Sequence, residues 1–203
     1  MKVAHVNYLP TPVYLPGKEN KIIAQAKVAY RENLNLDFFI LNSELESTEN
    51  NLYYKKIKFS ENKLLKSIQQ KLFRYKIIES LVPFKDYDYV VLRYPLAMGF
   101  GMKSFYKKWG KIIITEHHTI EERELKTYFQ NKILSLTASF IERQYKHHVF
   151  RCTRGMIGVT NEIVMHNEKS SDKKTVITNG FDIMSVNQST RPEYKKTFNI
   201  IFI

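Results

Sequence analysis

Lys111-Ile112-Ile113-Ile114-Thr115-Glu116-His117-His118-Thr119 joins a short apolar run directly to a polar cluster. The isoleucines are typical of a buried strand, and a carboxylate, two imidazoles and hydroxyl groups accompany its end. In an open parallel sheet, ligands bind beyond the carboxyl ends of the strands. The stretch therefore has two interpretations: a ligand site at the end of a strand, or a core strand followed by a solvated turn. The surrounding sequence has to supply the context.

Strand and helix patterns alternate on both sides of this stretch. Apolar strand patterns cover residues 2–8, 36–41, 53–59, 88–92, 112–115, 155–160 and 175–178. Helical spacing of apolar residues covers 19–33, 60–81, 98–109, 121–150 and 162–166, and residues 42–52 are polar enough to predict a surface loop. Repeated strand–helix–strand units form parallel sheets with right-handed crossovers. We therefore expect an α/β fold with a doubly wound, mostly parallel, Rossmann-like sheet of about seven strands.

The end of the chain predicts a second domain. Residues 1–184 contain the predicted sheet and form one domain, whereas residues 185–197 are polar and resemble a linker. Phe198-Asn-Ile-Ile-Phe-Ile203 again has the pattern of a buried strand. We expect this strand to be the first of a truncated C-terminal domain.

Composition narrows the classes of partner. The 203 residues carry a formal net charge of +12, which indicates an anionic partner such as nucleic acid, a membrane surface or a phosphorylated small molecule. The alternative is a basic protein whose charge serves solubility alone. Cys152 is the only cysteine, so no internal disulfide can form, as is usual in a reducing cytoplasm. Neither a signal-peptide pattern nor a run of about 18 apolar residues is present.

The predicted helix at 60–81 also has two interpretations. Phe73 and Ile77 lie opposite its main apolar stripe, among Lys63, Lys66 and Arg74. Apolar residues surrounded by basic ones are typical of helices that lie on an anionic bilayer. The other interpretation is an ordinary solvated basic face. If the helix lies on an anionic bilayer, the protein is expected at the inner face of the cytoplasmic membrane.

Histidine pairs raise the question of a metal site, and we expect none. His147-His148 repeats the His117-His118 pair, but adjacent residues of a helix point about 100° apart and cannot both face one ion. No His-Glu-x-x-His or Cys-x-x-Cys spacing accompanies them. A catalytic pair of Cys152 with a histidine is weaker still, because no third group is placed to orient it.

Four segments, taken in order, resemble a known family. These are Asp86-Tyr-Asp-Tyr-Val-Val-Leu-Arg93, Ile112-Ile-Ile-Thr-Glu-His117, Gly155-Met-Ile-Gly-Val-Thr-Asn-Glu162 and Val176-Ile-Thr-Asn-Gly-Phe-Asp182. Together they resemble the N-terminal half of a two-domain GT-B glycosyltransferase, and more narrowly the retaining glycosyltransferase family four, also called group 1. The order of elements agrees over essentially the whole chain. The first strand–helix loop departs from the family, because Lys18 follows Gly17 where family members usually carry paired glycines.

The resemblance implies an activity and a set of site residues. It implies transfer of a hexose-type sugar from a nucleotide sugar to a glycan or lipid-linked acceptor with retention, without a cofactor or metal. His117 is the implied catalytic histidine, with His118 as second choice. The remaining residues implied on the acceptor or donor side are Gly17, Lys18, Arg93, Glu116, His118, Thr119, Thr160 and Asn179. Basic residues that stabilise the leaving diphosphate belong to the C-terminal domain of the family, so we expect these 203 residues to be inactive alone.

Two other classes of function compete with the transferase. The net charge permits a non-enzymatic, basic α/β protein that binds nucleic acid or another anion, although no RRM, KH or helix-turn-helix pattern is present. We therefore expect no nucleic-acid partner. A stand-alone dinucleotide-binding domain would need a Gly-x-Gly-x-x-Gly sequence, which is absent.

Overall fold

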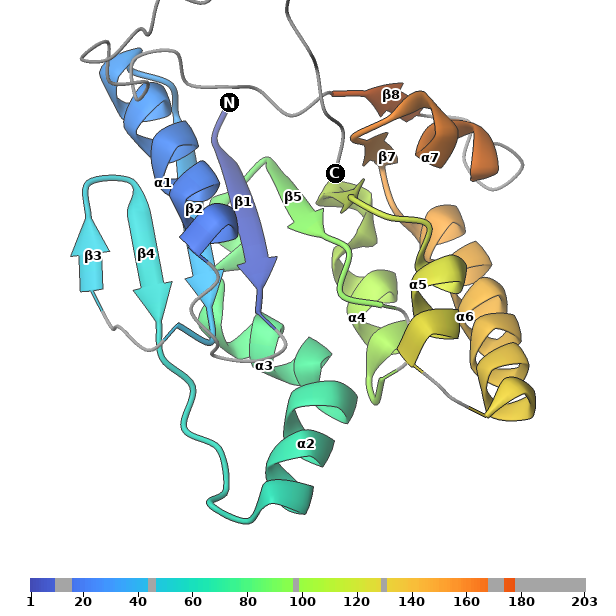
Figure 1. Cartoon of the computed structure of the whole chain (residues 1–203). Helices are drawn as coiled ribbons and strands as arrows, with labels where there is room; N and C mark the ends of the chain where they lie inside the picture. Colours follow the sequence, from blue (N-terminus) through green and yellow to red (C-terminus); the bar gives the residue numbers. More distant parts are fainter. Residues whose placement is uncertain (10–15, 44–46, 97–98, 129–130, 168–173, 178–203) are drawn as a thin grey trace, which may run out of the picture.

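The computed structural model describes residues 1–9, 16–43, 47–96, 99–128, 131–167 and 174–177. Within them lies one mostly parallel sheet flanked by helices, which confirms the predicted α/β class (Figure 1). The strands are β1 (Val3–Tyr8), β2 (Leu36–Leu41), β3 (Ser47–Glu49), β4 (Leu52–Lys55), β5 (Tyr89–Arg93), β6 (Ile113–His117), β7 (Gly155–Gly158) and β8 (Lys174–Val176). Their order across the sheet is β3-β4-β2-β1-β5-β6-β7-β8, and only the β3–β4 pair is antiparallel.

Seven α-helices and two short 3-10 turns connect the strands of the described part. The helices are α1 (Pro16–Arg31), α2 (Lys63–Leu72), α3 (Arg74–Leu81), α4 (Met102–Trp109), α5 (Glu121–Tyr128), α6 (Lys132–Cys152) and α7 (Asn161–His166). The 3-10 turns cover Phe84–Asp86 and Gly110–Ile112. Within the described residues, none of these helices combines the length and the apolar character that crossing a membrane requires.

Helices cover the two faces of the sheet unequally. On one face, α1 contributes Ile22, Ala26 and Ala29 to a core with side chains of β2 and β4. On the other face, α3, α4 and α6 pack on alternate residues of β1, β5 and β6 and form the larger core. Side chains of β5 and β6 that point to the α1 face are only half-buried, as at Val91 and Ile114. The described helices therefore cover this part of the sheet less completely than the face with the larger core.

The strand order places a topological switch point between β1 and β5. From β1 the chain moves outward to β2 and β4, then returns to β5 on the other side of β1 and continues outward to β8. Loops after two such strands diverge, and the crevice beyond their carboxyl ends is the usual ligand position in open α/β sheets. In Figure 1, this edge of the sheet is the end toward which the arrows of β1, β2 and β4 point.

Several elements differ from the sequence-based expectations. The loop predicted at 42–52 contains β3, so β3 and not the strand at 53–59 forms the edge of the sheet. The single helix predicted at 60–81 is two helices that meet at Phe73. The long helix predicted from 121 to 150 is also two, and α6 begins where the Asn131 side chain accepts hydrogen bonds from the amides of Ile133 and Leu134. Polar capping residues that restart a helix explain this break.

The predicted boundary between the two domains lies outside the described residues. The first domain was expected to reach residue 184, with a linker at 185–197 and a strand at 198–203. All residues from 178 onward lie outside the described part of the chain. The linker and the truncated second domain therefore stay predictions.

Candidate functional site

Strand β6 divides its side chains between two environments. The strand was expected to end at Thr115, but it continues to His117. Alternate residues of a strand point to opposite faces. Ile113, Thr115 and His117 are therefore buried under the helices, while Ile114 and Glu116 point to the half-buried α1 face. The two imidazoles of the opening stretch consequently have different surroundings.

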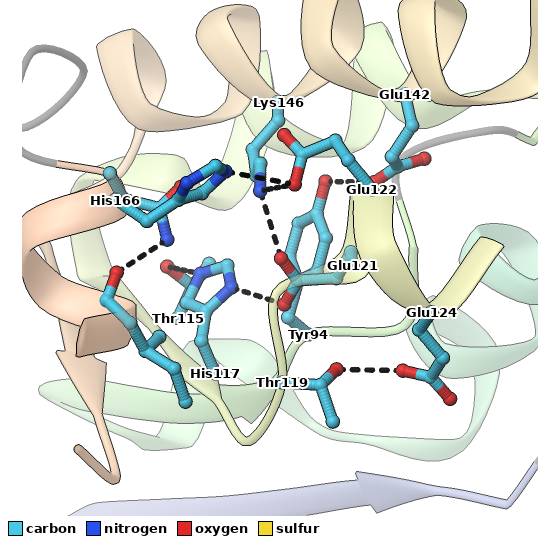
Figure 2. A network of polar contacts seen from close by, with 12 residues as sticks. Tyr94, Thr115, His117, Thr119, Glu121, Glu122, Glu124, Glu142, Lys146 and His166 are labelled. Carbon is cyan, nitrogen blue, oxygen red and sulfur yellow. Dashed lines mark hydrogen bonds and ion pairs between the residues drawn. The ribbon is translucent and has the colours of Figure 1, made fainter. Parts of the chain in front are cut away.

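The ring of His117 is fully enclosed. Its exposed fraction is 0%, and both ring nitrogens have partners: Nδ1 lies 2.7 Å from Glu121 Oε1 and Nε2 lies 3.1 Å from Thr115 Oγ1 (Figure 2). The ring of Tyr94 stacks on it with 4.5 Å between centroids. Because a carboxylate can only accept, Nδ1 donates the hydrogen bond to Glu121.

Glu121 connects His117 to a buried lysine. Lys146 Nζ lies 2.8 Å from Glu121 Oε2 and 2.7 Å from Glu122 Oε2, and its side chain is 3% exposed. Burial alone would raise the pKa of Glu121, but the charges and hydrogen bonds of His117 and Lys146 outweigh it and lower the pKa to about 2. Glu121 thus carries a charge in a buried position, where His117 and Lys146 stabilise it.

We call Thr115, His117, Glu121, Glu122 and Lys146 the buried network. Its hydrogen bonds join the end of β6 to α5 and α6, as Figure 2 shows. A ligand at the surface cannot reach His117 through this packing. The geometry favours the structural interpretation of His117 over the expected contact with a reacting sugar.

A second set of polar side chains lies on the α1 face at the switch point. In the registers of β1, β5 and β6, Leu92 is beside Val6 and Arg93 is beside Glu116. The β1–β5 pairing ends at Val6 and Leu92, and Asn7 and Arg93 are the next residues of the two strands. The three side chains Asn7, Arg93 and Glu116 thus form a row across adjacent strands, whose spacing is about 4.8 Å. We call this the polar row.

Two histidines hold Glu116 in the polar row. His5 Nε2 lies 2.9 Å from Glu116 Oε2, and His118 Nε2 lies 3.2 Å from Glu116 Oε1. Burial would raise the pKa of Glu116, but the hydrogen bonds from His118 and His5 outweigh it and hold the pKa well below its ordinary value. Glu116 is therefore an ionised acceptor whose orientation is fixed from both sides.

The other members of the row supply donors. Asn7 is 1% exposed, and within the described residues its Nδ2 has no hydrogen-bond partner. Burial lowers the pKa of Arg93 and of Lys21 on α1, and for both the nearby carboxylate of Glu116 opposes this shift. A guanidinium beside an ionised carboxylate can form paired hydrogen bonds with neighbouring hydroxyl groups, whereas the Asn7 amide is almost as enclosed as His117.

The remaining predicted site residues have local roles or lie elsewhere. Thr119 is exposed and donates to Glu124 Oε2 at 2.6 Å. Thr160 caps α7 by accepting a hydrogen bond from the Ile163 amide at 3.3 Å. Gly17 was expected in a loop but lies in the first turn of α1, which begins at Pro16. The side chain of Lys18 and all of Asn179 lie outside the described part.

The predicted membrane-contact set is only partly at the surface. Lys63 is exposed, Lys66 is half-buried, and Phe73 is 36% exposed. Arg74 was expected at the surface, but it is 9% exposed and its guanidinium donates to the backbone oxygen atoms of Lys71 and Pro95. Ile77 was also expected there, but it packs against the larger core. The exposure predicted for these two residues is wrong, because the chain turns at Phe73.

Sequence inspection missed three residues near the polar row: His5, Asn7 and Lys21. His5 and Asn7 occupy alternate positions of β1, and two polar residues on one face of a buried strand were a usable signal. The pairing of His5 with Glu116 joins positions 111 residues apart, which no local pattern predicts. Among the described residues, no three His, Cys, Asp or Glu side chains converge in a way that could hold a metal ion.

No family model matches this sequence, and no curated protein matches it.

Proposed function

We propose that the polar row binds the sugar acceptor of a retaining glycosyltransferase, for which this chain is the acceptor-side half. The carrying observation is the position of Asn7, Arg93 and Glu116 side by side at the topological switch point of a mostly parallel sheet. The resemblance of four sequence segments to glycosyltransferase family four supports the same function. The nucleotide-sugar donor and the retention of configuration rest on that resemblance.

The chemistry of the row suits a neutral, polyhydroxylated ligand. Each sugar hydroxyl both donates and accepts, so it can bridge a carboxylate and a guanidinium on neighbouring strands. Arg93 lies near the carboxylates of Glu116 and Glu124, and Lys21 lies near that of Glu116, so positive charge does not dominate the row. A site for a phosphate alone would need an excess of cationic groups.

The proposal assigns the acceptor contacts to His118 and Glu116 instead of His117. His118 is 19% exposed and bonded to Glu116, whereas His117 is enclosed. Glu116, oriented by His5 and His118, accepts from an acceptor hydroxyl, and Arg93 fixes the neighbouring oxygen. These contacts orient the acceptor, and orientation of the two reactants is a large part of catalysis in group transfer.

The test is sugar binding by the 203-residue chain, measured by saturation-transfer NMR with methyl glycosides of glucose, galactose and N-acetylglucosamine. We expect binding of at least one probe, with loss of the signal in Arg93→Ala and in Glu116→Gln. Arg31→Ala is the matched control, because Arg31 ends α1 and pairs with exposed Glu32. Binding that survives both row variants, or no binding of any probe, would overturn the proposal.

Two further measurements address activity and the competing class. Incubation of the 203 residues with uridine- and guanosine-diphosphate sugars and an acceptor should give no transfer, since the leaving-group site of the family lies in another domain. Detectable transfer would contradict this expectation. Tight binding of single- or double-stranded nucleic acid at physiological salt would favour the alternative, a basic anion-binding protein.

A further inference from the structure

Helix α6 exposes its large apolar residues in its first half. Ile133, Leu134, Leu136 and Phe140 are 75%, 56%, 53% and 63% exposed. The buried face of the helix follows a regular i, i+3, i+4 spacing instead, at Ser135, Ala138, Ser139, Glu142, Lys146, Val149 and Phe150. Burying small residues while four large apolar ones face solvent indicates that another surface covers them.

The small residues are needed for packing inside the molecule. Ser139 Oγ hydrogen-bonds to the backbone oxygen atoms of Glu122 and Ser135, at 3.1 and 2.9 Å, so α5 lies close to α6 along this face. The buried network continues the same face toward the end of the helix through Lys146. The orientation of α6 is therefore fixed by its own contacts, and its apolar face cannot turn inward.

A second apolar group occurs at the α2–α3 junction. Leu64 and Leu65 on α2 are 69% and 51% exposed. Phe73 and Phe100 are also exposed, and their rings lie 5.5 Å apart. Lys76 Nζ lies 5.8 Å from the centre of the Phe73 ring. Figure 1 shows α2 and the start of α6 at the same end of the molecule, the end that also contains the carboxyl ends of β1, β2 and β4.

The charges of these segments point to one kind of partner. Residues 62–78, 99–115 and 131–141 contain no Asp or Glu, and Lys63, Lys66, Lys71 and Lys132 accompany the exposed apolar residues. Lysine near an anionic bilayer contributes attraction, and the apolar side chains can enter the boundary between head groups and acyl chains. A second copy of this basic surface would meet like charge.

We propose that the first half of α6, together with α2, Phe73 and Phe100, docks on an anionic lipid bilayer. This inference does not depend on the proposed function. It replaces the membrane-contact set predicted from sequence, since Arg74 is buried, Ile77 is half-buried, and α6 contributes four of the eight exposed apolar residues of this surface. In this orientation, the carboxyl ends of the strands are directed toward the bilayer, and so is the polar row.

The first experiment is co-sedimentation of the 203-residue chain with vesicles of phosphatidylcholine, with and without phosphatidylglycerol. We expect binding that needs the anionic lipid and weakens as salt rises. Phe140→Ser should lower the partition coefficient roughly tenfold, and Lys63→Glu with Lys66→Glu should lower it by a similar factor. The matched controls are Tyr30→Ser and Lys27→Glu on α1, because Tyr30 is 57% exposed and Lys27 is also exposed.

Two further measurements complete the test: how deeply α6 inserts into the bilayer, and whether the chain forms dimers. Tryptophan fluorescence of Phe140→Trp should be quenched by brominated lipids more strongly than that of the parent chain, whose single tryptophan, Trp109, is partly buried in the core. Circular dichroism confirms that each variant is folded. Absence of vesicle binding would overturn the proposal. So would equal binding by parent and Phe140→Ser chains, or a dimer in light scattering that Phe140→Ser dissociates without any lipid effect.

Discussion

Replacing His117 and His118 by alanine, one at a time, distinguishes a role in core packing from a role in ligand binding. His117→Ala removes a fully buried ring, leaves a cavity beside Tyr94 and takes a donor from the charged Glu121. Large-to-small substitution in a core and loss of a hydrogen bond to a charged group together cost about 3–4 kcal/mol. His118→Ala removes a partly exposed partner of Glu116 and should cost less than about 1 kcal/mol.

Urea unfolding followed by circular dichroism measures both free energies. For a chain of this size, the His117→Ala loss corresponds to a melting temperature lower by roughly 10 °C. Sugar binding measured on the folded variants should show the opposite order: His118→Ala weakens binding, and His117→Ala does so only through reduced folding. Where the alanine variant fails to fold, His117→Asn supplies the same comparison with a smaller cavity.

Two results would refute this reasoning. The first is a His117→Ala chain within about 1 kcal/mol of the parent in stability that no longer binds sugar. Such a chain would show that the ring of His117 reaches the ligand. The second is a His118→Ala chain that loses as much stability as His117→Ala, because the exposure difference between the two rings would then have no energetic meaning.

Three further perturbations test the packing of the described part. Lys146→Met leaves Glu121 and Glu122 without their buried cation and should cost about 3–5 kcal/mol in urea unfolding, of which Glu121→Gln in the same chain restores a part. Glu121 should contribute about 3 kcal/mol to the unfolding free energy above pH 4.5, because its pKa is lower in the folded than in the unfolded chain, and this contribution is lost as the pH falls through about 2. Glu121→Gln should remove that part of the pH dependence and leave the part that comes from Glu116. Gly110→Ala would place a Cβ 2.3 Å from the backbone oxygen of Cys152 and should lower the melting temperature by several degrees, and an unchanged value would show that the backbone adjusts.

The class of fold was predictable because it depends on local patterns. Alternation of apolar strands with helices is visible in any window of the sequence, and it correctly indicated a mostly parallel sheet. Strand β3 was not predicted from the sequence, because its three residues, Ser47–Glu49, are polar and form a strand by pairing with β4. Its assignment depends on a partner strand and not on its own composition.

The orientation of α6 was not predictable from apolar spacing alone. Phe140 and Ile133 have the spacing of a core-facing stripe, and this correctly indicated a helix. Which face is buried depends on Ser135 and Ser139, whose small side chains let α5 approach. Packing against another helix can favour small residues over large ones, and a rule that counts only apolar residues then selects the wrong face.

The candidate site illustrates the same limit at the level of one strand. Strand β6 was expected to end at Thr115, which would leave both His117 and His118 in a loop with equal access to a ligand. Because β6 extends by two more residues, its side chains continue to alternate between the two faces of the sheet. Glu116 therefore points to the α1 face and His117 points to the helices of the larger core. A shift of one residue would exchange them, placing an imidazole in the polar row and a carboxylate beside Tyr94. The buried network holds His117 on the helix side of the sheet. By doing so, it fixes the register of β6 that places Glu116 beside Arg93.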